Sequence, residues 1–303
     1  TLISHAINEI AEDEDICTNK YVNIIKHNTG KLSNMVNELL DFHRVEVKSA
    51  QLRTTYTSIP EYVSDIYEEF KGWAEASDIH VNLQIDNPEI GMWIDPEHFG
   101  KILSNILSNS IRYSHAGSEI NIQVAKGYVN DIVPRYKDSF WNTKDMIPGE
   151  QAIIRVSDTG IGMEKAVLPT IFKRFHQVQN NTGKQHTGSG IGLSLVKSLI
   201  ELHHGGIIIS SKPDAGTEVI IALPISDTYL AKEEKIEEST FVLKDYLSNY
   251  AVEYEPLEIE ETTAIYMEGK PTILLVDDNH EILMILREYF VKDYNIIMAI
   301  DGQ

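Results

Sequence analysis

The sequence has little of what a secreted or membrane-spanning protein needs. It contains one cysteine, Cys17, so it cannot form an internal disulfide. No apolar run approaches the roughly 20 residues of a transmembrane helix, and no signal peptide is visible. We therefore expect a chain without a membrane segment that is placed in the cytoplasm.

Basic residues are also scarce, because 26 lysines and arginines stand against 46 aspartates and glutamates and give a net charge of -20. A surface of this sign repels nucleic acid and anionic membranes, so we expect no direct nucleic acid contact. The hydrophobic content of 42% is ordinary for a globular protein, and 303 residues leave room for two domains.

Two glycine turns stand out in the middle of the chain. The first, residues 158–162 (Asp-Thr-Gly-Ile-Gly), follows the apolar run 152–156, which is typical of a strand. The second, residues 188–193 (Gly-Ser-Gly-Ile-Gly-Leu), opens an amphipathic helix. Glycines let backbone N-H groups approach a polyphosphate, and a helix N-terminus favours negative charge. Taken alone, however, the second cluster is equally typical of a flexible loop.

A helical segment upstream, residues 101–113, carries asparagines on one face. Its apolar stripe consists of Ile102, Leu103, Ile106 and Leu107. Asn105 and Asn109 lie four residues apart and share a different face. An amide oxygen is a suitable ligand for Mg2+, which bridges to substrate phosphates. Together with the glycine turns, the two asparagines predict a nucleotide site.

These motifs resemble the nucleotide-binding boxes of sensor histidine kinases. Residues 105–113 are similar to the N box, 158–162 to the G1 box, 171–175 to the F box and 188–193 to the G2 box. Gly216-Thr217 resembles the late Gly-Thr pair that closes the same pocket. The resemblance implies an α/β sandwich of the GHKL type, the superfamily of gyrase, heat-shock chaperone and histidine kinase ATPases. Helices would cover one face of a mixed sheet, with ATP between the sheet edge and a lid.

The resemblance also implies a role for each matched residue. Asp158 would accept a hydrogen bond from the adenine amino group, while Gly160 and Gly162 would make room for the base. Asn109 would hold Mg2+, and Arg112, where the family more often has lysine, would contact phosphate.

The remaining matched residues complete a pocket for the implied cofactors, ATP and Mg2+. Tyr113 would pack against the adenine or the sugar, and Thr217 would lie beneath the base. The full ATP-binding set on this resemblance is Asn105, Asn109, Arg112, Tyr113, Asp158, Gly160, Gly162, Gly188, Gly190, Gly192, Leu193 and Thr217.

The N-terminal residues have the periodicity of a helical hairpin. Apolar residues recur at helical spacing over 2–10 and over 21–42, and the second stripe is too wide for a lone hairpin to cover. We therefore expect a homodimer through these helices, as a four-helix bundle. Residues 32–42 resemble the second helix of the kinase dimerisation and phosphotransfer domain, and 1–3 resemble the end of its H box. The resemblance places the phosphoacceptor histidine before the first residue; His5 lacks the acidic neighbour of that motif.

The C-terminal part of the chain changes character. Residues 225–270 are acidic and low in periodicity, which predicts a solvated linker with one short helical piece around 241–247. The buried-strand pattern of 272–276 then leads into Asp277 and Asp278, which resemble the Mg2+-binding acids of a response-regulator receiver domain. The phosphoacceptor aspartate would follow the last residue. A remnant of about 33 residues is below the usual limit for independent folding.

Two further segments receive no catalytic role. Residues 134–149 interrupt the predicted catalytic domain as an extended hairpin or loop, with a partner-binding knob as the alternative. His203 and His204 precede two glycines and indicate a helix C-terminus, where a partly protonated imidazole is favourable.

The sequence therefore predicts an α+β chain with four parts. These are dimerisation and phosphotransfer helices (1–48), an ATP-binding catalytic domain (49–224), an acidic linker (225–270) and a truncated receiver domain (271–303). On the resemblance, the chain is the catalytic portion of a hybrid sensor histidine kinase, the cytoplasmic part of a larger sensor in a two-component phosphorelay. It would pass the γ-phosphoryl group of ATP to a histidine and on to a receiver aspartate, in cis or on a separate response regulator. Without either acceptor, this chain would not phosphorylate itself.

Two other functions use the same pocket. An ATP-hydrolysing clamp of the gyrase and chaperone type carries a glutamate four residues before its Mg2+ asparagine; that position is Asn105, a poor general base. A pseudokinase scaffold would bind nucleotide only as a structural ligand.

Overall fold

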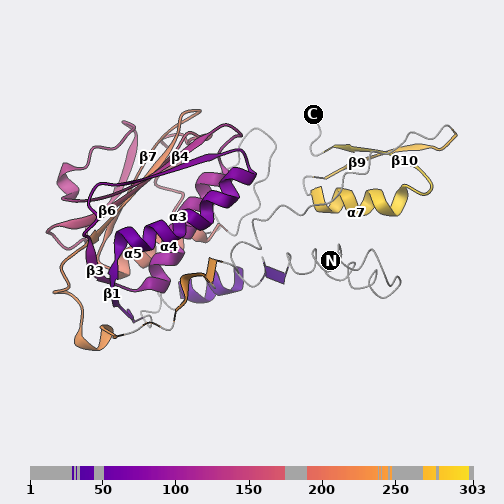
Figure 1. Cartoon of the computed structure of the whole chain (residues 1–303). Helices are drawn as coiled ribbons and strands as arrows, with labels where there is room; N and C mark the ends of the chain where they lie inside the picture. Colours follow the sequence, from indigo (N-terminus) through magenta and orange to yellow (C-terminus); the bar gives the residue numbers. More distant parts are fainter. Residues whose placement is uncertain are drawn as a thin grey trace. The chain divides into compact units, whose positions relative to one another are not determined.

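The computed structural model of the chain contains two compact units (Figure 1). The larger unit lies within residues 32–255, and the smaller one includes the C-terminal elements. The residues that the structure describes are 29–30, 32, 35–43, 51–174, 190–237, 239, 241–244, 246–247, 269–277 and 280–299.

A six-stranded mixed sheet forms the centre of the larger unit. Its strand order is β2-β4-β6-β8-β7-β5, with β2 parallel to β4 and every other neighbouring pair antiparallel. The strands are β2 (His80–Ile85), β4 (Glu119–Gly127), β5 (Ser139–Asn142), β6 (Gln151–Asp158), β7 (Gly206–Lys212) and β8 (Gly216–Pro224). β6, β7 and β8 are buried along nearly their whole length. Both faces of these central strands are therefore covered.

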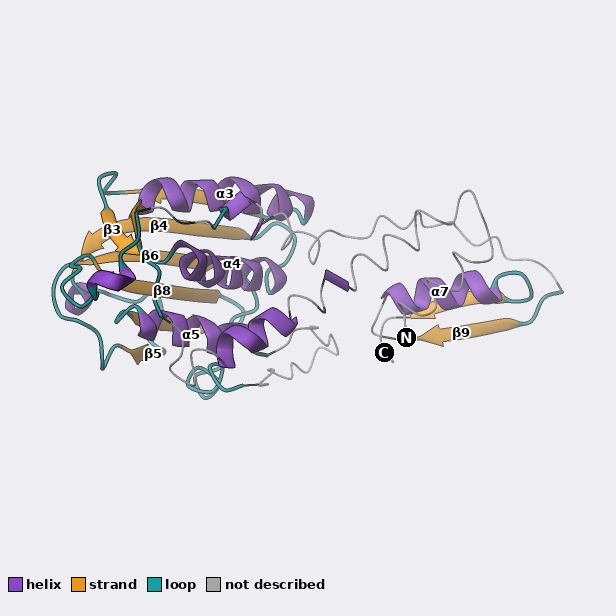
Figure 2. Cartoon of the chain, turned by 90° about the horizontal axis from the view of Figure 1, so that it is seen from below, coloured by secondary structure: helices purple, strands orange, loops and turns teal. Residues whose placement is uncertain are grey.

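Three helices, α3 (Ile59–Ala76), α4 (Pro96–Arg112) and α5 (Gly192–Leu202), cover one face of this sheet (Figure 2). Phe70 of α3 and Phe99 of α4 are fully buried in the core beneath them. A proline in the first turn of α3 and of α4 fits there, because those amides need no partner within the helix. A short antiparallel pair, β1 (Thr55–Ser58) and β3 (Gly91–Ile94), precedes α3 and α4. The predicted α/β sandwich is confirmed.

Residues 35–43 form a helix with two different faces. Leu39 and Leu40 are 49% and 50% exposed, whereas Phe42 is buried in the main core. The Arg174 guanidinium lies over the Phe42 ring, 4.3 Å from its centroid. The exposed apolar face supports a homodimer, which stays a prediction. The first helix of the predicted hairpin lies outside the described residues.

The first part of the predicted linker is folded onto the larger unit. The Thr54 amide donates to the Glu234 carbonyl at 2.7 Å, and the Ile236 amide donates to the Thr54 carbonyl at 2.9 Å. Leu247 is only 1% exposed and lies in the main core. The sequence predicts a solvated tether from residue 225 onward, but apolar residues among its charges pack this first part on the catalytic domain.

The C-terminal elements form a β-α-β unit. β9 (Thr272–Val276) and β10 (Asn295–Ala299) are parallel neighbours, and α7 (His280–Phe290) connects them. Leu274 and Ile297 lie opposite each other in the register and are 60% and 54% exposed, so one face of this small sheet is uncovered by the residues that the structure describes. The element order agrees with the start of a receiver domain, which stays a prediction.

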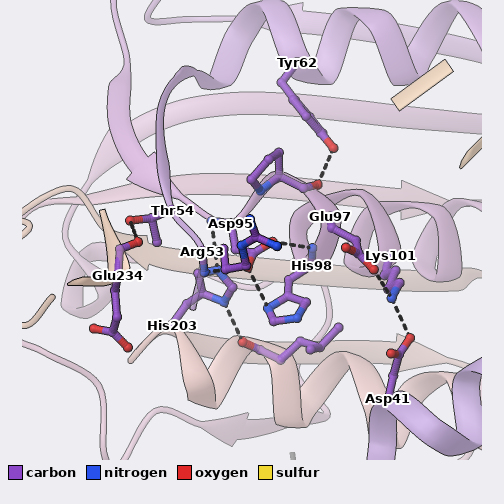
Figure 3. A network of polar contacts seen from close by, with 12 residues as sticks. Asp41, Arg53, Thr54, Tyr62, Asp95, Glu97, His98, Lys101, His203 and Glu234 are labelled. Atoms are coloured by element: carbon purple, nitrogen blue, oxygen red, sulfur yellow. Dashed lines mark hydrogen bonds and ion pairs between the residues drawn. The ribbon is translucent and has the colours of Figure 1, made fainter. Parts of the chain in front are cut away.

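A polar network joins the start of α4 to the end of α5 (Figure 3). The Asp95 side chain caps α4 by accepting the His98 amide at 3.2 Å, and it accepts the Arg53 amide at 2.9 Å. The Asp95 amide donates to Nε2 of His203 at 3.4 Å. One residue therefore holds the start of α4, the end of α5 and the segment before β1 together.

Lys101 connects α4 to the helical segment 35–43. Its Nζ lies 2.5 Å from Oδ2 of Asp41 and 2.7 Å from Oε1 of Glu97 (Figure 3). Burial alone would lower the pKa of Lys101, but the hydrogen bonds to these two carboxylates outweigh it and raise the pKa. The ammonium stays charged, and it holds the helical segment against α4.

His203 is a fully buried, neutral histidine. Its Nδ1 lies 2.8 Å from the Leu199 carbonyl, so Nδ1 carries the proton and donates, while Nε2 accepts the Asp95 amide. Burial lowers the pKa of His203 to about 4, with a further contribution from His98. The predicted helix C-terminus is confirmed, because α5 ends at Leu202 with His203 as its C-cap. The partly protonated imidazole expected there is wrong for His203, because its ring faces the core instead of water.

We expect His203 to make the folded state acid-sensitive. Its folded pKa of about 4 lies below the unfolded value of 6.5, so protons bind preferentially to the unfolded chain and stability falls as pH falls through this window. The group should contribute about 2 kcal/mol of lost stability between pH 7 and pH 5. Urea unfolding at both pH values should show a smaller loss in His203→Gln, whose amide can still accept and donate. Equal losses in both proteins would contradict this.

Candidate nucleotide site

Asp158, at the end of β6, is the centre of the site. Its side chain is 6% exposed, and Oδ1 accepts the Gly160 amide at 2.9 Å and the Thr217 amide at 3.1 Å. Burial raises the pKa of Asp158, while these two amides and the Ser110 hydroxyl lower it. The carboxylate is therefore held rigidly, with its orientation set by the two glycine-containing motifs on either side.

The turn between β7 and β8 packs against the backbone of Asp158. A side chain at Gly216 would place its Cβ 2.0 Å from the Asp158 carbonyl oxygen. The Thr217 hydroxyl lies 2.9 Å from Oγ of Ser211, which also donates to the Gly216 carbonyl at 2.9 Å. Thr217 is therefore next to Asp158, as the resemblance implies, and its position depends on a serine.

The glycines of the first turn make room for the protein backbone. A Cβ at Gly160 would lie 2.2 Å from the Tyr113 carbonyl oxygen, and one at Gly162 would lie 2.0 Å from the Lys212 carbonyl oxygen. The Ile161 amide donates to that same Tyr113 oxygen at 3.0 Å. The resemblance predicts that these glycines make room for the base. In the structure, backbone carbonyl oxygens are the atoms nearest to where a Cβ would lie at these two positions. Glycine is therefore also required there because the backbone segments pack closely.

Gly162→Ala should destabilise the larger unit by about 2–4 kcal/mol, because it adds positive-φ strain to a steric clash. Gly162 has φ +63, and the Lys212 carbonyl cannot move freely because it belongs to β7. Gly72→Ala is the matched control: no atom lies within 4 Å of its Cβ position in α3, so alanine should stabilise that helix by about 0.5–1 kcal/mol. Thermal unfolding of both variants measures the difference, and a neutral Gly162→Ala would contradict the packing described.

The predicted magnesium and phosphate residues lie on the last turns of α4. Asn105 is buried, and its amide donates to the Lys101 carbonyl at 3.0 Å. Its oxygen would be 2.3 Å from a Cβ at Gly192, so that glycine lets the start of α5 approach α4 closely. Asn109, one helical turn further, is half-buried. Arg112 closes the helix.

The second glycine cluster leads into the N-terminus of α5. Gly190 has φ +66, a conformation that glycine adopts readily, and α5 begins at Gly192. Leu193 follows in the first turn, where helix amides have no acceptor within the helix. Gly188 lies outside the described residues. α4 and α5 are packed neighbours, which brings the helix N-terminus beside the asparagine face of α4.

Sequence reasoning missed two serines of the site. Ser110 bonds to Asp158 from α4, and Ser211 holds Thr217, Gly216 and the Met163 amide, the last at 2.8 Å. Both are buried. Their positions in the sequence could have indicated this role. Each is a small polar residue at a core position of an apolar helix or strand, where a buried hydroxyl needs a hydrogen-bond partner.

The predicted receiver acids are only partly described. The Asp277 amide follows β9 and donates to the Ala299 carbonyl at 3.3 Å, while Asp278 lies outside the described residues. Within the described ranges, no three His, Cys, Asp or Glu side chains form a metal-binding group. No helix among the described residues is long and apolar enough to cross a membrane.

The part of the chain that carries the site matches a known ATPase family. Residues 94–227 match the family "Histidine kinase-, DNA gyrase B-, and HSP90-like ATPase", and this range contains all five motifs. The larger unit therefore contains a GHKL-type ATPase domain, as predicted.

Curated relatives of the chain are sensor kinases. It is 27% identical to Histidine kinase P4 of Formosa agariphila over 92% of this chain and 19% of that protein. It is 25% identical to the circadian input-output histidine kinase CikA of Thermosynechococcus vestitus over 94% of this chain and 34% of that protein. The similarity to hybrid sensor histidine kinases is confirmed, and this chain corresponds to their catalytic part. It spans about a fifth to a third of these relatives' length.

Solved structures share the fold at low sequence identity. The Acinetobacter baumannii histidine kinase AdeS matches with TM-score 0.52 and 17% identity, over 74% of this chain and 94% of that one. Full-length ShkA in complex with AMPPNP matches with TM-score 0.56 and 15% identity, over 99% of this chain and 52% of that one. Histidine kinase ThkA in complex with the response regulator TrrA matches with TM-score 0.51 and 19% identity, over 76% and 58%.

Proposed function

We propose that this chain binds ATP and is the catalytic portion of a hybrid sensor histidine kinase. The observation that carries the proposal is the geometry of Asp158: a buried carboxylate oriented by the amides of Gly160 and Thr217. A fixed acceptor of this kind suits the exocyclic amino group of adenine, which can only donate. Tyr113 packs against the adenine or sugar, and Thr217 lies beneath the base.

The phosphates are held where α4 and α5 meet. Arg112 supplies charge with a planar set of donors, and the amides at the start of α5 from Gly192 favour an anion. Asn109 offers an amide oxygen, the hard donor type that suits Mg2+, from a half-buried position that leaves access for water and phosphate. Bound magnesium would neutralise charge on the phosphates. Positioning and charge stabilisation are the main contributions that a phosphoryl-transfer site makes.

The acceptors of the phosphoryl group complete the proposal. We place the histidine on dimerisation helices preceding residue 1 and the aspartate on the receiver that starts at 271, or on a separate response regulator. Asp277 and Asp278 would hold the receiver's Mg2+. A homodimer would form through the exposed apolar face that includes Leu39 and Leu40. The ThkA neighbour, whose structure includes a response regulator, supports a partner of this kind.

An ATP-hydrolysing clamp is disfavoured by the surroundings of Asn105. An amide has no basic group that could activate water, and the Asn105 amide is also buried, donating to the Lys101 carbonyl with its oxygen against Gly192. A scaffold that binds nucleotide without transferring phosphate would need the same Asp158 geometry, so this geometry does not distinguish a scaffold from a kinase.

Labelled ATP separates these functions. The chain is mixed with Mg-ATP labelled on the γ-phosphate, alone and with a separate protein that carries complete H-box helices. We expect label only on the added histidine protein, because this chain supplies the nucleotide site and not the acceptor. Steady phosphate release without labelled protein would favour the clamp. Binding without transfer or release would favour the scaffold, and no binding would overturn the site.

A further inference from the structure

The segment between β4 and β6, residues 128–150, covers the sheet face opposite the helices. Ile132 of this segment is buried against Ile153, Ile208 and Ile220 in a second apolar cluster. Neighbouring residues of the same strands face the main core beneath α3, α4 and α5, because side chains alternate along a strand. The insertion is therefore packed on the sheet, and β5 within it forms the edge strand.

A buried carboxylate anchors the insertion to β8. Glu218 is 5% exposed; its Oε2 accepts the Arg135 amide at 2.7 Å and the Ser210 hydroxyl at 3.1 Å. Its Oε1 pairs with the Arg155 guanidinium at 3.1 Å, and the same guanidinium nitrogen donates to the Val133 carbonyl at 3.2 Å. Both carboxylate oxygens thus hold the backbone of the insertion in place.

The anchor lies one residue from the nucleotide site. Glu218 follows Thr217, whose amide donates to Asp158, and consecutive residues of a strand point to opposite faces. The start of β8 is therefore fixed from both sides, by the insertion on one face and by Asp158 on the other.

Tyr136 extends this support to the turn itself. Its hydroxyl donates to the Ala215 carbonyl at 2.5 Å, and the Ser211 amide donates to the Asp138 carbonyl at 3.2 Å. Ala215 directly precedes Gly216, which packs against the Asp158 backbone. The insertion thus contacts the turn that orients Asp158.

A second set of contacts reaches the segment after the first glycine turn. The Lys165 ammonium lies 3.2 Å from Oδ1 of Asp138, and the ring centroids of Phe140 and Phe172 are 5.5 Å apart. Phe172 belongs to the motif that resembles the F box. The insertion therefore contacts one nucleotide-binding motif directly, through Phe172, and the residues on either side of another, Ala215 and Glu218.

We propose that the insertion, residues 128–150, positions the nucleotide site: through Tyr136 and Glu218 it fixes the β7–β8 turn and with it the orientation of Thr217 and Asp158. The inference rests on the proposed function, since it names what keeps that site in its binding geometry. Tyr136 and Glu218 are positioning residues, because they act on the nucleotide only through the turn.

Tyr136→Phe tests this with the loss of one hydroxyl and no loss of ring packing. We expect the Kd for ATP to rise about 3- to 10-fold. Amide hydrogen exchange of Thr217 and Gly160 should become faster in the nucleotide-free protein, because the acceptor they share is less well fixed. Glu218→Gln, which keeps the shape but not the charge, should show the same two changes more strongly.

Tyr128→Phe is the matched control, since Tyr128 lies in the same insertion but is 52% exposed. It should leave both the Kd and the exchange rates unchanged. Unchanged Kd and exchange in Tyr136→Phe, with the unmodified chain binding ATP, would overturn the inference alone. A lower melting temperature in Tyr136→Phe with unchanged Kd would assign it a merely structural role and also overturn the inference. Failure of the unmodified chain to bind ATP would overturn the proposed function and the inference together.

Discussion

Asp158→Asn is expected to weaken ATP binding by about 100-fold, because the new side-chain NH2 group and the adenine amino group would both be hydrogen-bond donors facing each other in a buried site. The amides of Gly160 and Thr217 would still require the oxygen of the new side chain. Its NH2 group would then point to the place of the adenine amino group, where both partners donate. Calorimetric titration with ATP measures the loss.

The same variant should be at least as stable as the parent, since burial raises the pKa of Asp158 and the charged carboxylate is costly in this position. Affinity of the unmodified chain should also fall as pH falls toward that raised pKa, because the protonated acid resembles the asparagine. Asp65→Asn, on the exposed face of α3, is the control and should change neither property. Full ATP affinity in Asp158→Asn would show that the base is bound elsewhere.

Asn109→Ala should lower phosphoryl transfer to an added H-box protein by about 100-fold or more, because metal charge stabilisation is worth several kcal/mol. Removing the amide takes away the oxygen ligand for magnesium that we propose. Nucleotide binding without magnesium should change little, since we assign adenine recognition to Asp158. Initial rates with labelled Mg-ATP give the first quantity, and titration in a chelator gives the second.

Asn82→Ala provides the matched control for this experiment. Asn82 lies in the edge strand β2, where its amide bonds to Asn121 on the exposed surface at 3.1 Å. Transfer rates should equal those of the unmodified chain. Unchanged phosphoryl transfer in Asn109→Ala would remove Asn109 from the metal site. A loss of nucleotide affinity that is equal with and without magnesium would do the same.

The sequence predicts those parts of the site that depend on local pattern. The stripe of α4 places Asn105 and Asn109 on the second half of that helix, and Tyr113 after its end accepts the Ile161 amide of the G1 turn. Thr217 is found beside Asp158. These residues could be found because glycines, asparagines and helix periodicity impose their roles at short range. The mixed sheet with helices on one face follows from the fold that the motifs imply, whereas the order of its strands comes from the structure.

The sequence does not predict features that depend on distant packing. The burial of His203 depends on the elements packed around it. A rule based only on its place at a helix end therefore does not predict that the imidazole is neutral. The acidic composition after residue 225 predicts a solvated linker with a short helical piece around 241–247, but it does not indicate that Leu247 of this piece packs into the main core. Residues 134–149 are predicted only as an extended hairpin or loop, because β5 is four residues long and its partner, β7, lies far along the chain.

The adenine selectivity of the Asp158 site tests the central claim most directly. The unmodified chain is titrated with ATP and with GTP in the presence of magnesium. We predict that ATP binds and that GTP binds at least about 30-fold more weakly, because guanine presents a carbonyl oxygen to the Asp158 carboxylate where adenine presents an amino group. Equal affinity for both nucleotides, or binding of neither, would contradict the account.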